Sequence, residues 1–154
     1  MAFARDGKAP GAGFFTCQHH FPENFWNPEF QRHDNKATEV GAVVLAAPHP
    51  SRHARFLSSF TGVEPQSPGN EVLSFPLAQG QIDVMTPDVA GEAYGSVAAD
   101  PEHAAFVAFG IRVEDLDRQA RWLDAARIPY GRMGSRLVVP ASVAFGVAIA
   151  FEAT

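Results

Sequence analysis

The densest group of side chains that could bind a metal ion lies in the run Cys17-Gln18-His19-His20, which Glu23 follows closely. Imidazole and carboxylate groups suit zinc, nickel or iron. Adjacent side chains of an extended strand point to opposite faces, so His19 and His20 should not both enter one pocket. A bend at Pro22 would bring Glu23 back toward one of them. Two interpretations stay open: a metal site of His19, His20 and Glu23 with His20 as a catalytic candidate, or a polar strand end.

The other histidines and the cysteine carry a weaker signal for chemistry. Cys17 is the only cysteine, which excludes an intramolecular disulfide and a thiolate zinc cluster. We expect Cys17 to be a buried small hydrophobic residue. His49, His53 and His103 fall at predicted turns and on a predicted helix, and we expect all three at the surface.

Length and composition limit the classes of protein to which this chain could belong. Its 154 residues fit one domain. Hydrophobic residues make up 46% of the chain, and 13 residues are Phe, so a packed core is expected. The net charge of -5 makes nucleic acid and anionic membranes poor partners. The sequence has no apolar run long enough to predict a membrane span, and its first residues lack the apolar core of a secretory signal. We expect a cytoplasmic protein.

Residues 37–154 show a regular alternation of predicted strands and helices. β-branched residues favour a buried strand over 40–47. The helix that follows this strand is expected to end at Gly62. Residues 78–80 are predicted to close a hairpin, and residues 87–101 to form a long connection. The predicted strands are 40–47, 71–77, 81–85, 105–113, 131–133, 136–139 and 144–152, and the predicted helices are 50–60 and 114–127.

Residues 1–36 form an arm of different composition. It is predicted to hold two short strands, near 2–5 and 13–18, and a short helix starting at Asn27-Pro28-Glu29. Phe25 and Trp26 are predicted core or interface anchors. Such a hairpin is marginal alone in water, so the arm should dock on a sheet edge or face of its own chain or a neighbour. We expect a homodimer with the arm near the interface.

The sequence repeats itself at a constant offset of 66 residues. Residues 52–57 (RHARFL) fall on residues 118–123 (RQARWL), and Ala42 falls on Ala108. The same strand-then-helix unit is therefore predicted twice, and two such units can share one curved sheet with helices outside. Phe56 and Trp122 should then occupy equivalent positions and pack against the sheet.

The segments AFVAFGIRVEDLDRQARWLDAARIPY and GVAIAFEA resemble the second-module opening and closing strand of the vicinal oxygen chelate superfamily, which includes glyoxalases, bleomycin-resistance proteins and extradiol dioxygenases. The resemblance implies an α+β fold of paired βαβββ modules, about 39–100 and 101–154, within a glyoxalase-like domain of 37–154. The segment GFFTCQHHFPENFWNPEFQ is similar to a link between two such domains. That similarity implies that the chain corresponds to the C-terminal part of a longer architecture, with the arm ending a preceding domain.

The resemblance also implies where a metal would sit in related proteins. Three of the four ligand positions fall on Ala42, Ala108 and Ala150, and only Asp83 keeps an acid. Methyl groups cannot coordinate a cation, so we expect no metal or other cofactor there and an apolar binding pocket formed by these four residues. Asp83 would act alone as a base or hydrogen-bond acceptor, or be an exposed strand acid.

Three functions of different classes follow from these residues. The first is a glyoxalase-like domain that binds a small apolar or aromatic molecule, or a partner domain, without metal. An alternative is a metal-dependent lyase, isomerase or dioxygenase that uses the arm's His and Glu residues with Asp83, across a dimer. The third is a structural part of a longer enzyme. Fold alone does not choose among them, and whether the chain is an enzyme stays open.

Overall fold

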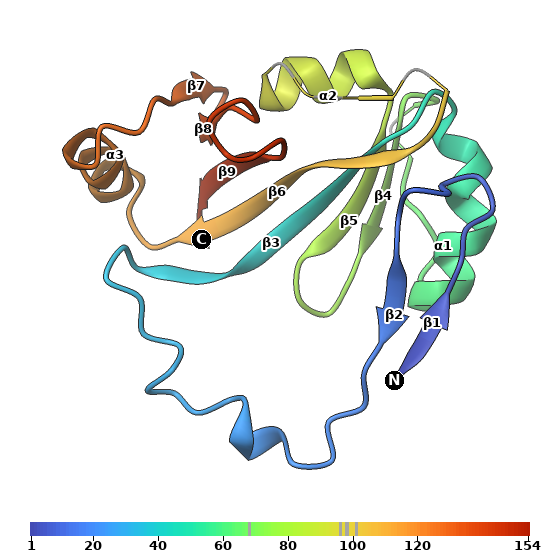
Figure 1. Ribbon diagram of the computed structural model, residues 1–154, viewed down its shortest axis with the longest axis horizontal. Helices are drawn as coiled ribbons and strands as arrows, with labels where there is room; N and C mark the ends of the chain where they lie inside the picture. The colour runs from blue at the N-terminus through green and yellow to red at the C-terminus, as the bar shows by residue number, and fades with distance from the viewer. Residues whose placement is uncertain (68, 96, 98, 101) are drawn as a thin grey trace.

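The computed structural model describes residues 1–67, 69–95, 97, 99–100 and 102–154. A seven-stranded mixed sheet curves through the molecule, with helices packed on it (Figure 1). The prediction of an α+β fold is confirmed. The sheet order is β4-β5-β3-β6-β9-β8-β7. Its strands are β3 (Ala37–Ala46), β4 (Val72–Pro76), β5 (Gln81–Met85), β6 (Ala105–Val113), β7 (Gly131–Met133), β8 (Arg136–Val139) and β9 (Ala148–Ala153).

The sheet consists of two similar halves that meet at the antiparallel pair β3 and β6. β3 pairs with β5 in parallel, as β6 pairs with β9. Val44 is opposite Asp83 in the first half, and Gly110, 66 residues later, is opposite Ala150 in the second. The predicted repeat is therefore confirmed. Where the second half has β7, the first has an isolated bridge between Gln66 and Ser74.

Three α-helices accompany the sheet: α1 (Ala54–Thr61), α2 (Pro87–Tyr94) and α3 (Leu116–Ala125). The 3-10 turn η2 (Pro50–His53) leads into α1, which ends where Gly62 adopts a φ of 73°. A left-handed residue at this point is a common helix ending, and glycine adopts it without a steric penalty. Asp115 caps α3 by accepting a hydrogen bond from the Arg118 amide at 2.9 Å.

Both α1 and α3 pack on one face of the sheet, and α2 packs on the other. Leu57 of α1 shares a core with Leu45 and Phe75, whereas Leu123 of α3 shares one with Phe151. The prediction for Trp122 is wrong, because its side chain is 45% exposed. The buried stripe of α3 is formed by Gln119, Ala120 and Leu123, so its neighbour Trp122 is turned toward solvent.

Three expected element boundaries are corrected by the structure. Residues 87–94 form α2, with Pro87 in its first turn, and are not part of a long connection. Residues 96, 98 and 101 of that expected connection lie outside the described residues. β9 begins at Ala148, four residues later than expected, after a run of turns. The expected helix at Asn27 is only a turn, in which Asn27 accepts the Glu29 amide at 3.0 Å, while a 3-10 turn, η1, lies at Pro22–Asn24.

The beginning of the arm packs against α1 as a hairpin of β1 (Ala2–Ala4) and β2 (Phe14–Thr16). The ring of Phe14 is buried, with its centroid 4.9 Å from that of Phe56, 5.5 Å from Phe60 and 5.7 Å from Phe106. The arm therefore docks on its own chain, with Phe14 buried in the same cluster as Ala9 and Ala12.

The rest of the arm, residues 17–35, loops away from the sheet (Figure 1). Cys17 is exposed, so the expectation that it is buried is wrong. Strand β2 ends at Thr16, and the following residues make no regular pairing that would bury a side chain. The large exposed side chains of this segment are Phe21, Phe25, Trp26 and Phe30.

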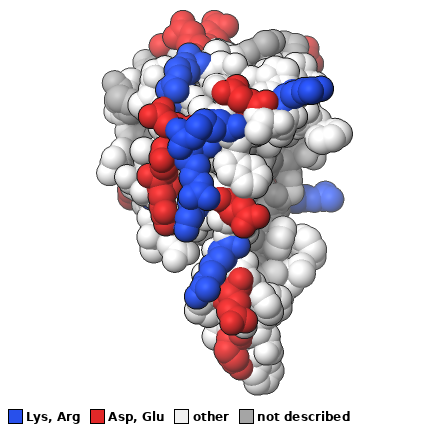
Figure 2. Space-filling view, turned by 90° about the vertical axis from the view of Figure 1, so that its left-hand side faces the viewer, with Lys and Arg blue, Asp and Glu red and all other residues white. Residues whose placement is uncertain are grey.

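The face that carries α3 has both signs of charge. Figure 2 shows acidic and basic side chains alternating down it. Arg121 lies 4.0 Å from Asp115, and Arg132 lies 3.5 Å from Asp117. Such a mixed surface does not favour a polyanionic partner. Among the described residues, no helix has the length and apolarity needed to cross a membrane.

Candidate functional site

Three buried alanines lie on the face of the sheet that α2 covers, which is here called the inner face. Gly110 is paired with Ala42 on one side and with Ala150 on the other, and Ala108 is two residues before Gly110. A Cβ placed on Gly110 would lie 3.5 Å from the Cβ of Ala42, so both point to the same side. The floor of this part of the inner face is therefore formed by small apolar groups.

Asp83 lies on the inner face beside these alanines. It is opposite Val44, which is in turn opposite Ala108. Its side chain is buried, and its two carboxylate oxygens accept hydrogen bonds from Ser74 Oγ at 2.6 Å and Gln81 Nε2 at 2.7 Å. The alternative interpretation of an exposed strand acid is therefore wrong. Two hydrogen bonds from neutral donors offset part of the cost of burying a carboxylate.

Tyr94, the last residue of α2, covers the alanine floor. Its side chain is fully buried in one cluster with Val44, Ala108 and Ala150. Its hydroxyl is buried and has no hydrogen-bond partner among the described residues. The guanidinium carbon of Arg136 lies 5.2 Å from the centre of the ring, within cation–π range.

The surroundings keep the Tyr94 hydroxyl protonated. Burial raises its pKa to about 12, against a smaller lowering by the Arg136 guanidinium. The carboxylates of Asp83 and Glu152 raise the pKa further. At neutral pH this hydroxyl is therefore a hydrogen-bond donor inside a mostly apolar space, and it is free to bind an acceptor.

A row of alternating charges crosses the inner face beyond the alanines. Glu39, Arg112, Glu152 and Arg136 come from β3, β6, β9 and β8, which are neighbours in the sheet. Arg112 lies 2.6 Å from Glu39, and Arg136 lies 2.9 Å from Glu152. Gly110 leaves room for this row, because a Cβ there would lie 3.1 Å from Glu152 Oε1. All four side chains are partly exposed, so they form a polar edge to the apolar floor.

The residues present do not fit the divalent metal that the fold family implies. Alanine methyl groups offer no lone pair, and one carboxylate is too few for a stable transition-metal site. Within the part of the chain that the structure describes, no three His, Cys, Asp or Glu side chains are grouped so that they could hold a metal ion. His20 and Glu23 are exposed, and His19 stacks on Phe25 with ring centroids 4.8 Å apart.

The expectation for the remaining histidines is right for two and wrong for one. His49 and His103 are exposed, but His53 is buried. Its ring nitrogen Nδ1 lies 2.6 Å from Asp6 Oδ2. Asp6 comes from the arm, 47 residues earlier, and no local pattern in the sequence indicates that the two residues meet.

Sequence reasoning missed Tyr94 and the row of charges. For Glu152 and Arg112 a signal existed, because the period of two along a strand places them on the same face as Ala150 and Ala108. For Tyr94 the signal was the Pro87 start of a helix in a segment expected to be a connection.

Solved structures with a similar fold were found, but no protein-family profile and no curated protein sequence matches this chain. The methylmalonyl-CoA epimerase of Mycobacterium tuberculosis is similar with a TM-score of 0.58 and 17% identity, over 79% of this chain and 91% of that one. A variant of the Streptomyces coelicolor methylmalonyl-CoA epimerase, in complex with 2-nitronate-propionyl-CoA, is similar with a TM-score of 0.56 and 12% identity, over 77% and 95%.

A hypothetical protein from Bacillus halodurans C-125 is similar with a TM-score of 0.54 and 11% identity, over 75% of this chain and 94% of that one. The chain has the vicinal oxygen chelate fold. The resemblance noted in the sequence is therefore confirmed at the level of fold. Identities this low carry no activity with them, so the vicinal oxygen chelate fold leaves the chemistry of the inner face to be argued from its own residues.

Proposed function

We propose that this vicinal oxygen chelate domain binds a small aromatic or apolar molecule on its inner face, without a metal ion. The observation that carries the proposal is the position of the Tyr94 side chain. A phenol ring lies in one buried cluster with Ala108 and Ala150, and its buried hydroxyl has no partner within the described part of the chain. The surroundings therefore suit an aromatic ring with a polar substituent.

The proposed site has the composition of a small-molecule pocket. Such sites are mostly apolar, with a few polar groups that fix the orientation of the ligand. Here the floor is formed by Ala42, Ala108 and Ala150, and Arg136 and Glu152 lie at the edge. A ligand would enter by displacing the Tyr94 ring, which sits at the C-terminal end of the short helix α2.

Metal independence follows from the same residues. The alanines replace side chains that would otherwise donate to a cation, and both oxygens of Asp83 are already engaged by Ser74 and Gln81. The donor groups of the inner face are thus suited to hydrogen bonding and cation–π contact. No Lewis-acid step is part of the proposal.

The test uses 4-methylphenol, which is the tyrosine side chain without its backbone, in buffer containing EDTA. A ligand at a hundredfold excess over its Kd stabilises the native state by about 2.7 kcal/mol, so the melting temperature should rise by several degrees. Cyclohexanol at the same concentration controls for a solvent effect. Stabilisation that requires added zinc, nickel or iron would favour the metal-dependent alternative and sink this proposal.

We also propose that the chain is a homodimer held by the exposed aromatic segment of the arm. Phe21, Phe25, Trp26 and Phe30 are all exposed in one chain, and each would gain about 1.5–3 kcal/mol on burial. Docking of this segment on a second copy would bury these rings, and in a dimer with twofold symmetry the contact forms twice.

Light scattering tests the dimer. The intact chain should have twice the monomer mass of 16.6 kDa. The double variant Phe25→Ser with Trp26→Ser should be monomeric, whereas Phe3→Ser, which changes an exposed ring outside the segment, should stay dimeric. If the intact chain were monomeric, the dimer proposal would be wrong.

A further inference from the structure

A second site lies away from the inner face, where the arm meets the end of η2. Here the buried imidazole of His53 is held by Asp6, with 2.6 Å between Nδ1 and Oδ2. The other oxygen of Asp6 accepts the Lys8 amide at 2.9 Å. Both oxygens of Asp6 are used, so the carboxylate fixes the orientation of the ring and binds the proton-bearing Nδ1.

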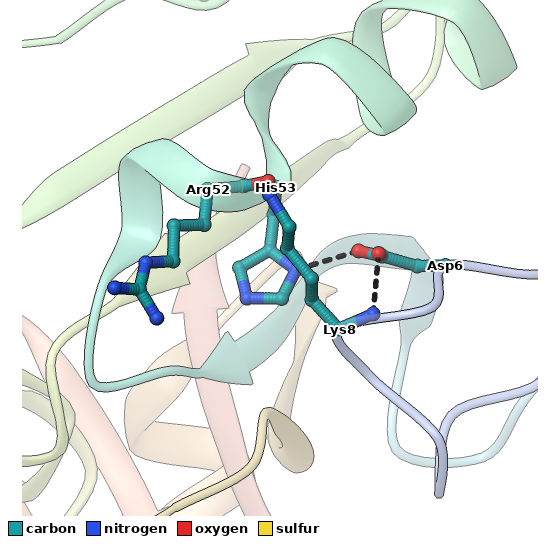
Figure 3. A network of polar contacts seen from close by, with 4 residues as sticks. All are labelled: Asp6, Lys8, Arg52 and His53. Atoms are coloured by element: carbon teal, nitrogen blue, oxygen red, sulfur yellow. Dashed lines mark hydrogen bonds and ion pairs between the residues drawn. The ribbon is translucent and has the colours of Figure 1, made fainter.

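This arrangement leaves His53 Nε2 as the chemically active nitrogen. A carboxylate that accepts from Nδ1 sets the tautomer in which Nε2 carries a lone pair. Nε2 can then accept a hydrogen bond from a hydroxyl group. Figure 3 shows the ring between the Asp6 carboxylate and the side chain of Arg52. Among the described residues, Nε2 has no hydrogen-bond partner of its own.

A hollow of about 320 Å³ lies at this ring. Three separate segments line it, which are the arm loop, the turn before α1 and the residues before β6. The lining residues are Lys8, Pro48, His49, Arg52, His53, Glu102, His103 and Ala104. The volume is at the lower end of the range for small-molecule sites.

Two basic side chains line the hollow and can donate to an anion. Arg52 and Lys8 have no carboxylate within ion-pair distance in the described part of the chain, and Lys8 Nζ lies 3.5 Å from the Arg52 carbonyl oxygen. Glu102 is the one acid among the lining residues described. The residues that line the hollow thus carry two positive charges and one negative charge, and the carboxylates of Asp6 and Asp100 are paired with His53 and His103.

The loop that brings His103 to the hollow is held in place by its own hydrogen bonds. Asp100 Oδ1 accepts the amides of Glu102 at 2.7 Å and His103 at 2.9 Å. These bonds hold the pKa of Asp100 below its usual value. Asp100 Oδ2 also lies 3.4 Å from His103 Nδ1, so this side of the hollow is built before any ligand arrives.

We propose that this hollow binds a phosphate group, either free or carried on a small molecule. Arg52 would donate to two of its oxygens, since a guanidinium matches phosphate geometry, and Lys8 would supply a second positive charge. A phosphate monoanion carries at least one P–OH group, and this group donates to His53 Nε2. The site is separate from the inner face, so it stands or falls independently of the function proposed there.

The experiment follows the imidazole nitrogens of His53 by NMR in the full-length protein at pH 6.5. Inorganic phosphate and phenyl phosphate are titrated separately, against sodium chloride at equal ionic strength. We expect a saturable shift of the His53 Nε2 resonance with at least one of the two phosphates and none with chloride. The tighter of the two identifies whether the site takes free phosphate or a monoester.

Two arginines of the same helical segment provide a matched pair of variants. Arg52→Ala should weaken phosphate binding at least tenfold, whereas Arg55→Ala, which removes an exposed arginine outside the hollow, should change it less than twofold. Circular dichroism establishes that both variants are folded. The absence of a saturable shift, or equal weakening by both substitutions, would overturn the proposal.

Discussion

The ring of Tyr94 lies under the guanidinium group of Arg136, with 5.2 Å between the guanidinium carbon and the ring centre. The same ring lies in one buried cluster with Ala108 and Ala150. The consequence is a site whose polar groups sit at one edge and whose floor is apolar.

Tyr94→Phe should leave the fold intact and raise the free energy of unfolding by about 1 kcal/mol. The substitution removes a buried hydroxyl that has no partner among the residues that the structure describes, and such a group costs free energy when it is taken from water. Urea unfolding measures the change. Tyr130→Phe is the control. The Tyr130 hydroxyl is near the surface and its hydrogen bond to Asp124 is long, at 3.4 Å, so its loss should change the stability little. A fall in stability for Tyr94→Phe would show that the hydroxyl has a partner in solution.

The stability of the protein should fall between about pH 10 and pH 12. Tyr94 has a pKa of about 12 in the folded state and 10.0 as its unperturbed value, so in this window the unfolded chain has lost a proton that the native state keeps. Fewer protons on the unfolded state means that stability decreases with rising pH, by up to about 1.4 kcal/mol per pH unit. Unfolding of the wild type and Tyr94→Phe at several pH values isolates the effect. Parallel pH profiles of the two proteins would contradict it.

Asp83→Asn should destabilise the protein by about 1–3 kcal/mol. The carboxylate accepts from Ser74 and Gln81, and an amide would turn a donor toward one of them. Asp34→Asn, on the exposed arm, is the matched control and should be neutral. Equal midpoints of denaturation for the two variants would show that Asp83 is not engaged as described.

Phe14→Ala should cost about 3–5 kcal/mol, while Phe15→Ala should cost less than 1 kcal/mol. The two residues are neighbours on β2, but Phe14 is buried among three rings and Phe15 is 55% exposed. Thermal or urea unfolding compares them directly. Similar losses for both would mean that the hairpin does not pack on α1 in solution.

Much of the fold could be predicted because strand patterns and the internal repeat agree. The limits of β6, β7 and β8 follow from apolar runs and turn residues, and the offset of 66 residues correctly relates Val44 to Gly110. The position of Trp122 could not be read in the same way. A repeat gives its place on the helix but not how far the helix rotates toward the sheet, and α3 buries Gln119 instead.

The site was less predictable than the fold. The alternation of side chains along each strand predicts that Ala108 and Ala150 lie on one face of the sheet. It does not indicate which residues cover that face. Tyr94 arrives from a separate helix, and His53 meets Asp6 across 47 residues. Contacts between segments that are distant in sequence leave no local pattern in a single sequence.

The central claim is that aromatic molecules bind on the alanine floor without metal. Its most direct test is an NMR titration of the protein, labelled at the alanine methyl groups with carbon-13, with 4-methylphenol in EDTA. The account predicts saturable shifts for Ala42, Ala108 and Ala150 and no change for the exposed Ala2. The Tyr94→Ala variant should bind at least tenfold more tightly, because no ring must be displaced. If only that variant bound 4-methylphenol, and the wild-type methyl signals did not shift at the highest ligand concentration, Tyr94 would be a permanent part of the core. That result would contradict the account.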